Sequence, residues 1–185
     1  MINDYLVPYL KKHKCKSFLD VGCSYGGLIA KLGTIFPEMK VLGIDISRNF
    51  IREAKQMYPG FDYRVMDIRK PLPVKKFDIV HTIAVFIHLT HEDIEKAIKN
   101  VMRAGKVGLF TESMGEEERG TLTYDPDTYW DNRCGRKEAN QLDYNIQYYF
   151  KHDYRKLFKK LGYKVRVLKK WDDKAKTRLY EVTKD

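Results

Sequence analysis

The chain has 185 residues, of which 43% are hydrophobic and 32% charged, and 35 Lys and Arg against 25 Asp and Glu give it a formal net charge of +10. This length and balance predict a folded domain with a sizeable core and exclude a disordered chain. The most apolar stretch, 79–89, contains two histidines and is far shorter than the roughly 20 residues of a membrane span, and the first residues lack the basic region of a secretory signal.

Three cysteines are scattered along the chain at Cys15, Cys23 and Cys134. Their odd number and the absence of C-x-x-C spacing argue against a disulfide framework and against a zinc site. We therefore predict a cytoplasmic protein without a metal site. The positive charge suggests an anionic partner, and a solvated lysine-rich face explains it equally well.

Strands and helices alternate over the first 111 residues. The predicted strands cover 16–21, 41–45, 61–66, 77–83 and 107–111. The predicted helices cover 26–36, 47–58 with Ser47 as N-cap, and 90–104, opened by a capping box at Thr90. Residues 2–14 have helical spacing, but Pro8 predicts a short helix or two broken turns. Alternation of this kind predicts a parallel sheet with right-handed crossovers.

Regular patterning stops after strand 107–111 and resumes near the end of the chain. Residues 114–149 lack clear periodicity, which is typical of a substrate-binding insertion or lid. A helix over 152–161 with Gly162 as its C-cap follows, and then strands at 163–171 and 178–183 that form an antiparallel hairpin. We predict one domain over 1–185.

A glycine-rich turn joins the first strand to the first long helix. The apolar run 17–21 contains Asp20, and Gly22, Ser24 and Gly26 follow before the helix. A strand, a tight loop and a helix N-terminus together form a common binding place for nucleotide-like ligands in α/β folds. The spacing does not match a dinucleotide site, because Ser24 stands where the G-x-G-x-x-G fingerprint requires glycine.

Acidic residues occur at the ends of the first three predicted strands, at Asp20, Asp45 and Asp67. Ligands of such sheets bind beyond the carboxyl ends of the strands. Asp45 lies 23 residues after Gly22 (45 − 22), near the spacing of a carboxylate that accepts hydrogen bonds from ribose hydroxyls. Asp67 is placed to accept from the exocyclic amine of an adenine.

These features resemble the class I S-adenosylmethionine-dependent methyltransferases. Asp20, Gly22 and Gly26 match motif I of the family (acid-x-Gly-x-Gly-x-Gly), and Ser24 replaces its middle glycine. Segments 41–47, 65–68 and 77–89 resemble the ribose, adenine and fourth-strand motifs. The resemblance implies a doubly wound, mostly parallel seven-stranded sheet with helices on both faces, an antiparallel C-terminal hairpin, and S-adenosyl-L-methionine as cofactor.

Mapped onto this chain, the family motifs imply a set of cofactor-binding residues. They are Asp20, Gly22, Cys23, Ser24, Gly26, Asp45, Ile46, Asp67, Ile68 and Thr82. Glu112 and His152 are candidate bases that face the acceptor, with a capping or surface role as the alternative for each. We expect His81 to be a hydrogen-bonded core histidine and Cys23 to be chiefly a small loop residue.

The implied reaction is O- or N-methylation of a small or medium polar metabolite. RNA or another polyanion is the second acceptor class, because of the basic surface. A third hypothesis, from a different class, is a non-catalytic cofactor-binding scaffold subunit. The nearly intact motif I and the three strand-end acids argue against it. We expect no membrane partner, and the sequence has no signal that sets an oligomeric state.

Overall fold

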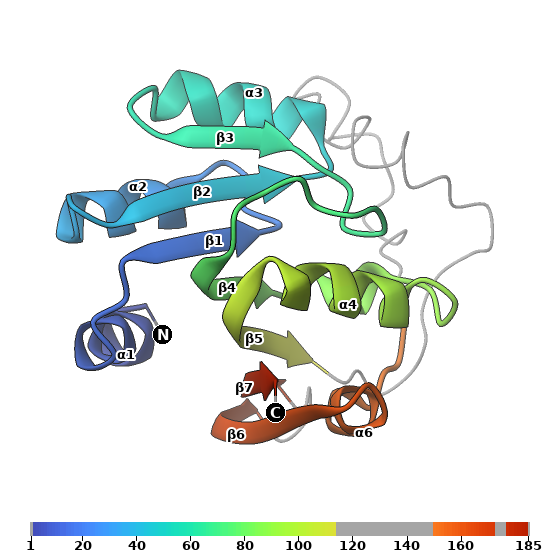
Figure 1. Ribbon diagram of the computed structural model, residues 1–185. Helices are drawn as coiled ribbons and strands as arrows, with labels where there is room; N and C mark the ends of the chain where they lie inside the picture. Colours follow the sequence, from blue (N-terminus) through green and yellow to red (C-terminus); the bar gives the residue numbers. More distant parts are fainter. Residues whose placement is uncertain (1, 114–149, 173–176, 185) are drawn as a thin grey trace.

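The computed structural model describes residues 2–113, 150–172 and 177–184, and it contains a seven-stranded sheet in the order β3-β2-β1-β4-β5-β7-β6 (Figure 1). The strands are β1 (Ser17–Val21), β2 (Lys40–Asp45), β3 (Asp62–Val65), β4 (Phe77–Ile83), β5 (Gly105–Ser113), β6 (Tyr163–Asp172) and β7 (Thr177–Lys184). The pairs β1–β2, β1–β4, β2–β3 and β4–β5 are parallel, and β7 is antiparallel to both β5 and β6. The predicted fold class, including the antiparallel C-terminal hairpin, is confirmed.

Helices cover both faces of the sheet (Figure 1). They are η1 (Ile2–Leu6), α1 (Val7–Lys12), α2 (Gly27–Ile35), α3 (Arg48–Met57), the short 3-10 helix η2 (Phe86–His88), α4 (Ile94–Arg103) and α6 (Tyr154–Lys160). One hydrophobic core joins α1, α2 and α3 to the sheet, and a second joins α4 and α6 to it. Burial of such apolar faces is the main term that stabilises a fold of this kind.

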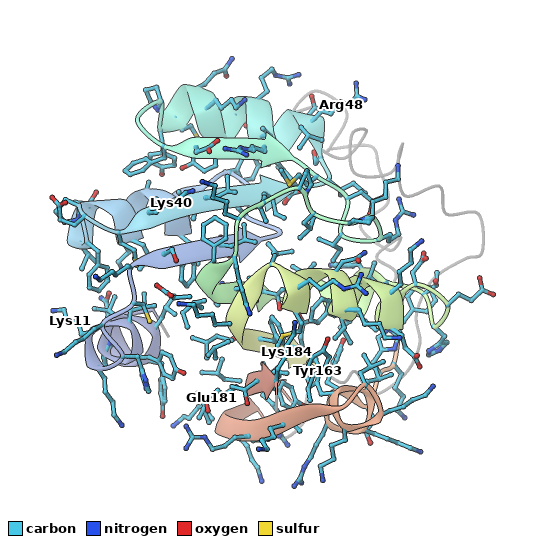
Figure 2. All side chains as sticks on the ribbon, viewed as in Figure 1. Lys11, Lys40, Arg48, Tyr163, Glu181 and Lys184 are labelled. Carbon is cyan, nitrogen blue, oxygen red and sulfur yellow. The ribbon has the colours of Figure 1, made fainter. Side chains whose placement is uncertain are left out.

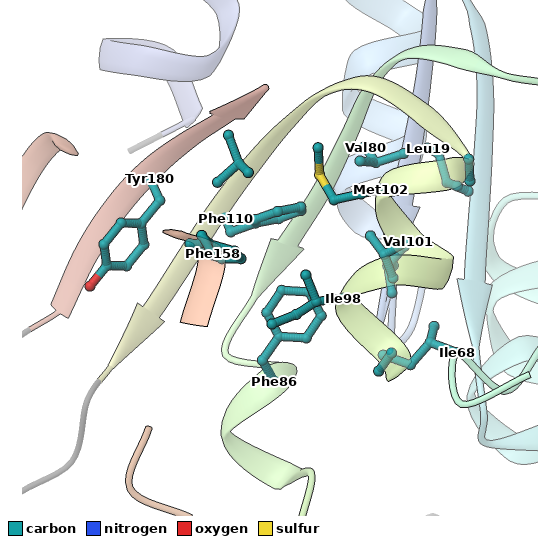
Figure 3. Close-up of a cluster of buried hydrophobic side chains, with 14 of the residues drawn as sticks. Leu19, Ile68, Val80, Phe86, Ile98, Val101, Met102, Phe110, Phe158 and Tyr180 are labelled. Carbon is teal, nitrogen blue, oxygen red and sulfur yellow. The ribbon is translucent and has the colours of Figure 1, made fainter. Parts of the chain in front are cut away.

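The core beneath α4 and α6 is built from aliphatic and aromatic side chains of several elements (Figure 3). Ile98 and Val101 of α4 are fully buried there, as are Phe110 of β5 and Phe158 of α6. Phe86 of η2 lies in the same cluster, and its ring packs edge-on against Phe110 with centroids 5.2 Å apart. The segment after β4 is therefore anchored in the core.

Helix boundaries agree with the sequence patterns, with small corrections. Ser47 caps α3 as predicted, and its hydroxyl accepts a hydrogen bond from the Phe50 N–H. Thr90 accepts from the Asp93 N–H but closes a separate turn, so α4 begins only at Ile94 and the predicted capping box does not open the helix itself. Pro8 lies in the first turn of α1, where the missing N–H costs little.

At the C-terminal end, α6 is shorter than predicted. It begins at Tyr154, and the carboxylate of Asp153 caps it by accepting from the Lys156 N–H at 3.0 Å. Gly162 follows with φ +79°, in the left-handed region expected of a residue that ends a helix. The predicted lid at 114–149 lies outside the described residues, and the single-domain assignment stays a prediction.

Charged side chains cover the outside of the molecule (Figure 2). The exposed cations Lys11, Lys40, Arg48 and Lys184 lie on α1, β2, α3 and β7, so the positive charge extends over several elements. Within the described ranges, no helix is both long enough and apolar enough to cross a membrane.

Candidate functional site

A cavity of about 680 Å³ opens at the carboxyl ends of the central parallel strands. Its described lining comes from the ends of β1, β2, β3 and β4 and from the loops that follow them. Among these residues are Val21, Gly22, Ser24, Asp45, Ile46, Phe50, Asp67, Ile68, Ala84, Val85 and His88. The volume lies within the range of about 300–1,000 Å³ typical of small-molecule and cofactor sites.

The glycine loop between β1 and α2 forms one wall of this cavity. Gly22, Ser24 and Gly26 all have left-handed backbone, with φ of +72°, +50° and +78°. A Cβ atom on Gly22 would lie 2.4 Å from Val85 Cγ2, and one on Gly26 would lie 2.5 Å from the Tyr63 ring. Both glycines are thus required by backbone conformation and by close packing.

Tyr63 of β3 supports the glycine loop from the core side. Its side chain is buried, and its hydroxyl donates a hydrogen bond to the Gly26 carbonyl oxygen at 3.0 Å. Sequence reasoning missed this residue. The available signal was a bulky aromatic in a short polar strand, which does not reveal that the ring reaches a loop 37 residues earlier.

Asp45 connects two loops at the cavity wall. Its Oδ2 accepts from the Ser24 N–H at 3.0 Å, and its Oδ1 accepts from the Ser47 N–H at 2.9 Å. Burial raises the pKa of this carboxyl and outweighs the lowering by the two backbone hydrogen bonds. Because each carboxylate oxygen has two acceptor positions, Asp45 retains capacity for ligand hydroxyls.

Asp67 also lines the cavity, but its carboxylate is engaged by Arg69. The Arg69 Nη2 lies 2.8 Å from Asp67 Oδ2, and the Arg69 N–H and Nε donate to Oδ1 at 2.9 and 3.0 Å. Desolvation would raise the pKa of Asp67, but these contacts hold it below its ordinary value. Its expected contact with an adenine amine stays a prediction.

Asp20 of β1 and His81 of β4 form a buried pair on adjacent strands. The His81 Nδ1 lies 2.9 Å from Asp20 Oδ1, and both side chains are almost fully buried. The expectation that His81 is a hydrogen-bonded core histidine is confirmed. Cys23 is also buried, and desolvation raises the pKa of its thiol, which suits an inert loop residue.

Glu112, near the end of β5, is fully buried. Its Oε1 accepts from the Thr82 hydroxyl at 2.7 Å, from the Val85 N–H at 3.1 Å and from the Phe86 N–H at 3.3 Å. Burial raises its pKa to about 7, although these hydrogen bonds lower it. One carboxylate oxygen of Glu112 thus binds both the end of β4 and the segment that follows it.

His152, just before α6, is buried against the loop that precedes α4. Its Nε2 lies 2.8 Å from the Leu89 carbonyl oxygen, and its ring packs against His91 with centroids 5.0 Å apart. Since a carbonyl can only accept, Nε2 carries the hydrogen, and Nδ1 is the nitrogen that can take up a proton in the neutral ring.

The structure thus brings together part of the predicted cofactor set. The predicted residues that line the cavity are Gly22, Ser24, Asp45, Ile46, Asp67 and Ile68. The predicted residues absent from its described lining are Asp20, Cys23, Gly26, Thr82, Glu112 and His152. Their contact with a ligand stays a prediction. In the described part of the chain, no group of three or more His, Cys, Asp or Glu is arranged to hold a metal.

Comparison with known proteins agrees with this geometry. A family model described as "Methyltransferase domain" matches residues 18–108, which include the glycine loop, Asp45 and Asp67. Over 98% of its length the chain superposes, with a TM-score of 0.66 and 18% identity, on 77% of the magnesium protoporphyrin IX methyltransferase of Synechocystis PCC 6803, crystallised with bound S-adenosylmethionine. Residues 18–108 thus match the methyltransferase family, and the described fold is that of the class I S-adenosylmethionine-dependent methyltransferases.

Curated relatives match parts of this methyltransferase domain. It is 31% identical over 91 residues, or 49% of the chain, to 235L of Invertebrate iridescent virus 6, a protein named as a methyltransferase. It is 31% identical over 67 residues, or 36% of the chain, to the trans-aconitate 2-methyltransferase of Azoarcus sp. (strain BH72). The matches span 34% and 26% of the length of these relatives.

S-adenosylmethionine is the cofactor of this family, and the cavity fits it in size and in chemistry. The glycine loop keeps its backbone close to the cavity, and Asp45 offers carboxylate oxygens to ribose hydroxyls. The side chains of Phe50 and Ile68 add apolar surface to the wall. When bound, the cofactor supplies an activated methyl group on its sulfonium.

Proposed function

We propose that this methyltransferase domain transfers the methyl group of S-adenosylmethionine to an oxygen or nitrogen of a small or medium polar metabolite. The observation that carries the proposal is the cavity at the strand ends, lined by the glycine loop together with Asp45 and Asp67. In this proposal Gly22 and Ser24 lie against the methionine moiety, Asp45 accepts from the ribose, and Asp67 and Ile68 flank the adenine. We also propose a cytoplasmic location, from the free Cys15 and Cys23.

His152 is the proposed general base of the reaction. A hydroxyl or amine acceptor must lose a proton during or after attack, and a neutral imidazole is a common general base for such a proton. The Nε2–H bond to the Leu89 carbonyl orients the ring and assigns proton uptake to Nδ1. Leu89 itself lines the cavity, which places this loop close to the proposed acceptor.

RNA is the second candidate acceptor, and the basic residues of α6 and β6 favour it. Lys159, Lys164 and Lys170 are exposed there. Lys160 of this region pairs with Glu95, and Arg166 pairs with Glu181. A scaffold role without catalysis is the third candidate, and it predicts cofactor binding without methyl transfer.

The test is a methyl-transfer assay with labelled S-adenosylmethionine against separate metabolite and RNA pools. The proposal predicts label in the metabolite pool, and it predicts that His152→Ala lowers turnover by about 100-fold while cofactor affinity stays nearly unchanged. Label only in RNA, with affinity that falls steeply as salt rises, would select the second candidate. Tight cofactor binding without transfer to either pool would select the scaffold role.

A further inference from the structure

The segment that follows β4 forms a wall of the cavity in a strained conformation. Ile83, Ala84, Val85 and His88 line the cavity, and Ala84 has a left-handed φ of +53°. Non-glycine residues rarely adopt this backbone region because it is strained, so surrounding contacts must hold Ala84 in place.

Those contacts come chiefly from the end of β5. The Thr111 carbonyl oxygen accepts from the Ala84 N–H at 2.8 Å. Glu112 Oε1 accepts from the Thr82 hydroxyl and from the N–H groups of Val85 and Phe86. One carboxylate oxygen therefore joins both sides of the turn at Ala84, while the buried Phe86 ring anchors its far side in the core (Figure 3).

Val85 transmits this restraint to the glycine loop. Its methyl group occupies the space beside Gly22 where a Cβ would stand, at 2.4 Å from that position. The opposite side of the loop is held by β2, because the N–H groups of Gly22 and Cys23 both donate to the Ile44 carbonyl oxygen, at 2.8 and 3.0 Å. The turn and the glycine loop form a continuous wall of the cavity.

We propose that Glu112 is a positioning residue for the cofactor, whose carboxylate holds the turn of residues 82–86 against the glycine loop. The inference rests on the proposed use of the cavity by S-adenosylmethionine. Glu112 acts through Thr82, Val85 and Phe86, and its own side chain is fully buried and is not part of the described cavity lining.

We call the three hydrogen bonds from Thr82, Val85 and Phe86 to Glu112 the Glu112 clamp. Two substitutions at Glu112 distinguish the effect of this clamp from the effect of side-chain packing. Glu112→Gln keeps an amide oxygen that can accept from the same three donors, whereas Glu112→Ala leaves those donors without their buried partner. Tyr154→Phe is the matched control. The Tyr154 hydroxyl is buried near Glu112 and has no hydrogen-bond partner among the described residues, so its removal leaves the clamp intact.

The experiment combines S-adenosylhomocysteine calorimetry with amide hydrogen exchange at Val85 and Phe86 in the full chain. We expect Glu112→Ala to weaken binding at least about 10-fold and to speed exchange at both amides. Glu112→Gln should stay within about 3-fold of wild type, and Tyr154→Phe should change neither measurement. If Glu112→Ala does not fold, Thr82→Val removes the shortest bond of the clamp and should weaken binding about 3- to 10-fold.

Wild-type affinity in Glu112→Ala, or in Thr82→Val where that variant replaces it, would overturn the positioning role. So would a loss of turnover in both Glu112 variants at unchanged affinity, which would make Glu112 the base instead. Failure of the wild-type chain to bind S-adenosylhomocysteine would refute the proposed function, and the positioning role with it. Wild-type binding that does not depend on Glu112 would refute the positioning role alone.

Discussion

At the scale of single residues, the buried polar groups were the hardest part of the site to predict. Asp20 and His81 are 61 positions apart in the sequence, and only the pairing of β1 with β4 brings them together. Glu112 and Thr82 meet in the same way through the pairing of β4 with β5. The sequence identifies these residues as noteworthy, but their partners depend on strand order and register.

The first residue-scale prediction concerns the Asp20–His81 pair. Replacing His81 with Leu leaves the Asp20 carboxylate buried without its partner, which should lower the free energy of unfolding by about 3–5 kcal/mol. Denaturant-induced unfolding measures the change. Lys106→Ala is the control, because it breaks the pair with Asp78 at an exposed position and should change stability little. An equal loss of unfolding free energy in the two variants would contradict the claim that burial makes the Asp20–His81 pair important for stability.

The second residue-scale prediction follows from the raised pKa of Glu112, about 7 against an ordinary 4.5. Between these values the folded chain retains a proton that the unfolded chain releases, so stability falls as pH rises and levels off above about pH 7. Among the described residues, the phenols of Tyr154 of α6 and Tyr180 of β7 interact electrostatically with Glu112, and burial keeps both neutral in this range.

Glu112→Gln lacks this titration. The free energy of unfolding of wild type, measured relative to Glu112→Gln, should therefore fall by about 1–3 kcal/mol from pH 4.5 to pH 8. Urea unfolding at a series of pH values gives this difference directly. A difference that is constant with pH, or that rises, would show that the buried carboxyl does not titrate in this window.

At the scale of elements, local sequence signals were sufficient to predict the glycine loop. The residues from other parts of the fold that support this loop could not be predicted in the same way. The glycine loop was predicted because its cause is local, namely left-handed backbone at Gly22 and Gly26. Its supports, Val85 and Tyr63, belong to other strands and turns, and no local pattern marks them. The helix starts at Ile94 and Tyr154 were predicted too early for a related reason, since a turn and an N-cap residue precede them.

The element-scale prediction is that Gly22→Ala distorts the glycine loop. The new Cβ would meet Val85 at 2.4 Å, and the left-handed φ adds strain, so we expect a loss of about 1–3 kcal/mol in stability and a fall in S-adenosylhomocysteine affinity of about 10-fold or more. Gly60→Ala is the control, because in the described part of the chain no atom beyond its two chain neighbours lies within 4 Å of its added Cβ. Calorimetry that finds equal affinity in both variants would contradict the account of this loop.

At the scale of the whole molecule, alternating strand and helix patterns predicted the parallel sheet, and the family resemblance implied the helices on both of its faces. Parallel strands with helical crossovers allow few topologies, and the C-terminal hairpin completes the order β5-β7-β6. The function of the charge was less accessible, because exposed cations lie on many elements and several pair with nearby acids. The amino-acid composition gives the number of charged residues but not their positions in the fold.

The central claim is that the cavity beyond the strand ends binds S-adenosylmethionine, with Asp45 at the ribose. The most direct measurement is calorimetric titration of S-adenosylhomocysteine into wild type, Asp45→Ala and the control Asp62→Ala, whose carboxylate pairs with Arg64 on the surface. We predict binding by wild type and by Asp62→Ala, and a loss of about 1.5–3 kcal/mol in Asp45→Ala, about 10- to 150-fold in affinity. Unchanged affinity in Asp45→Ala would contradict the ribose assignment, and no binding by wild type would contradict the claim itself.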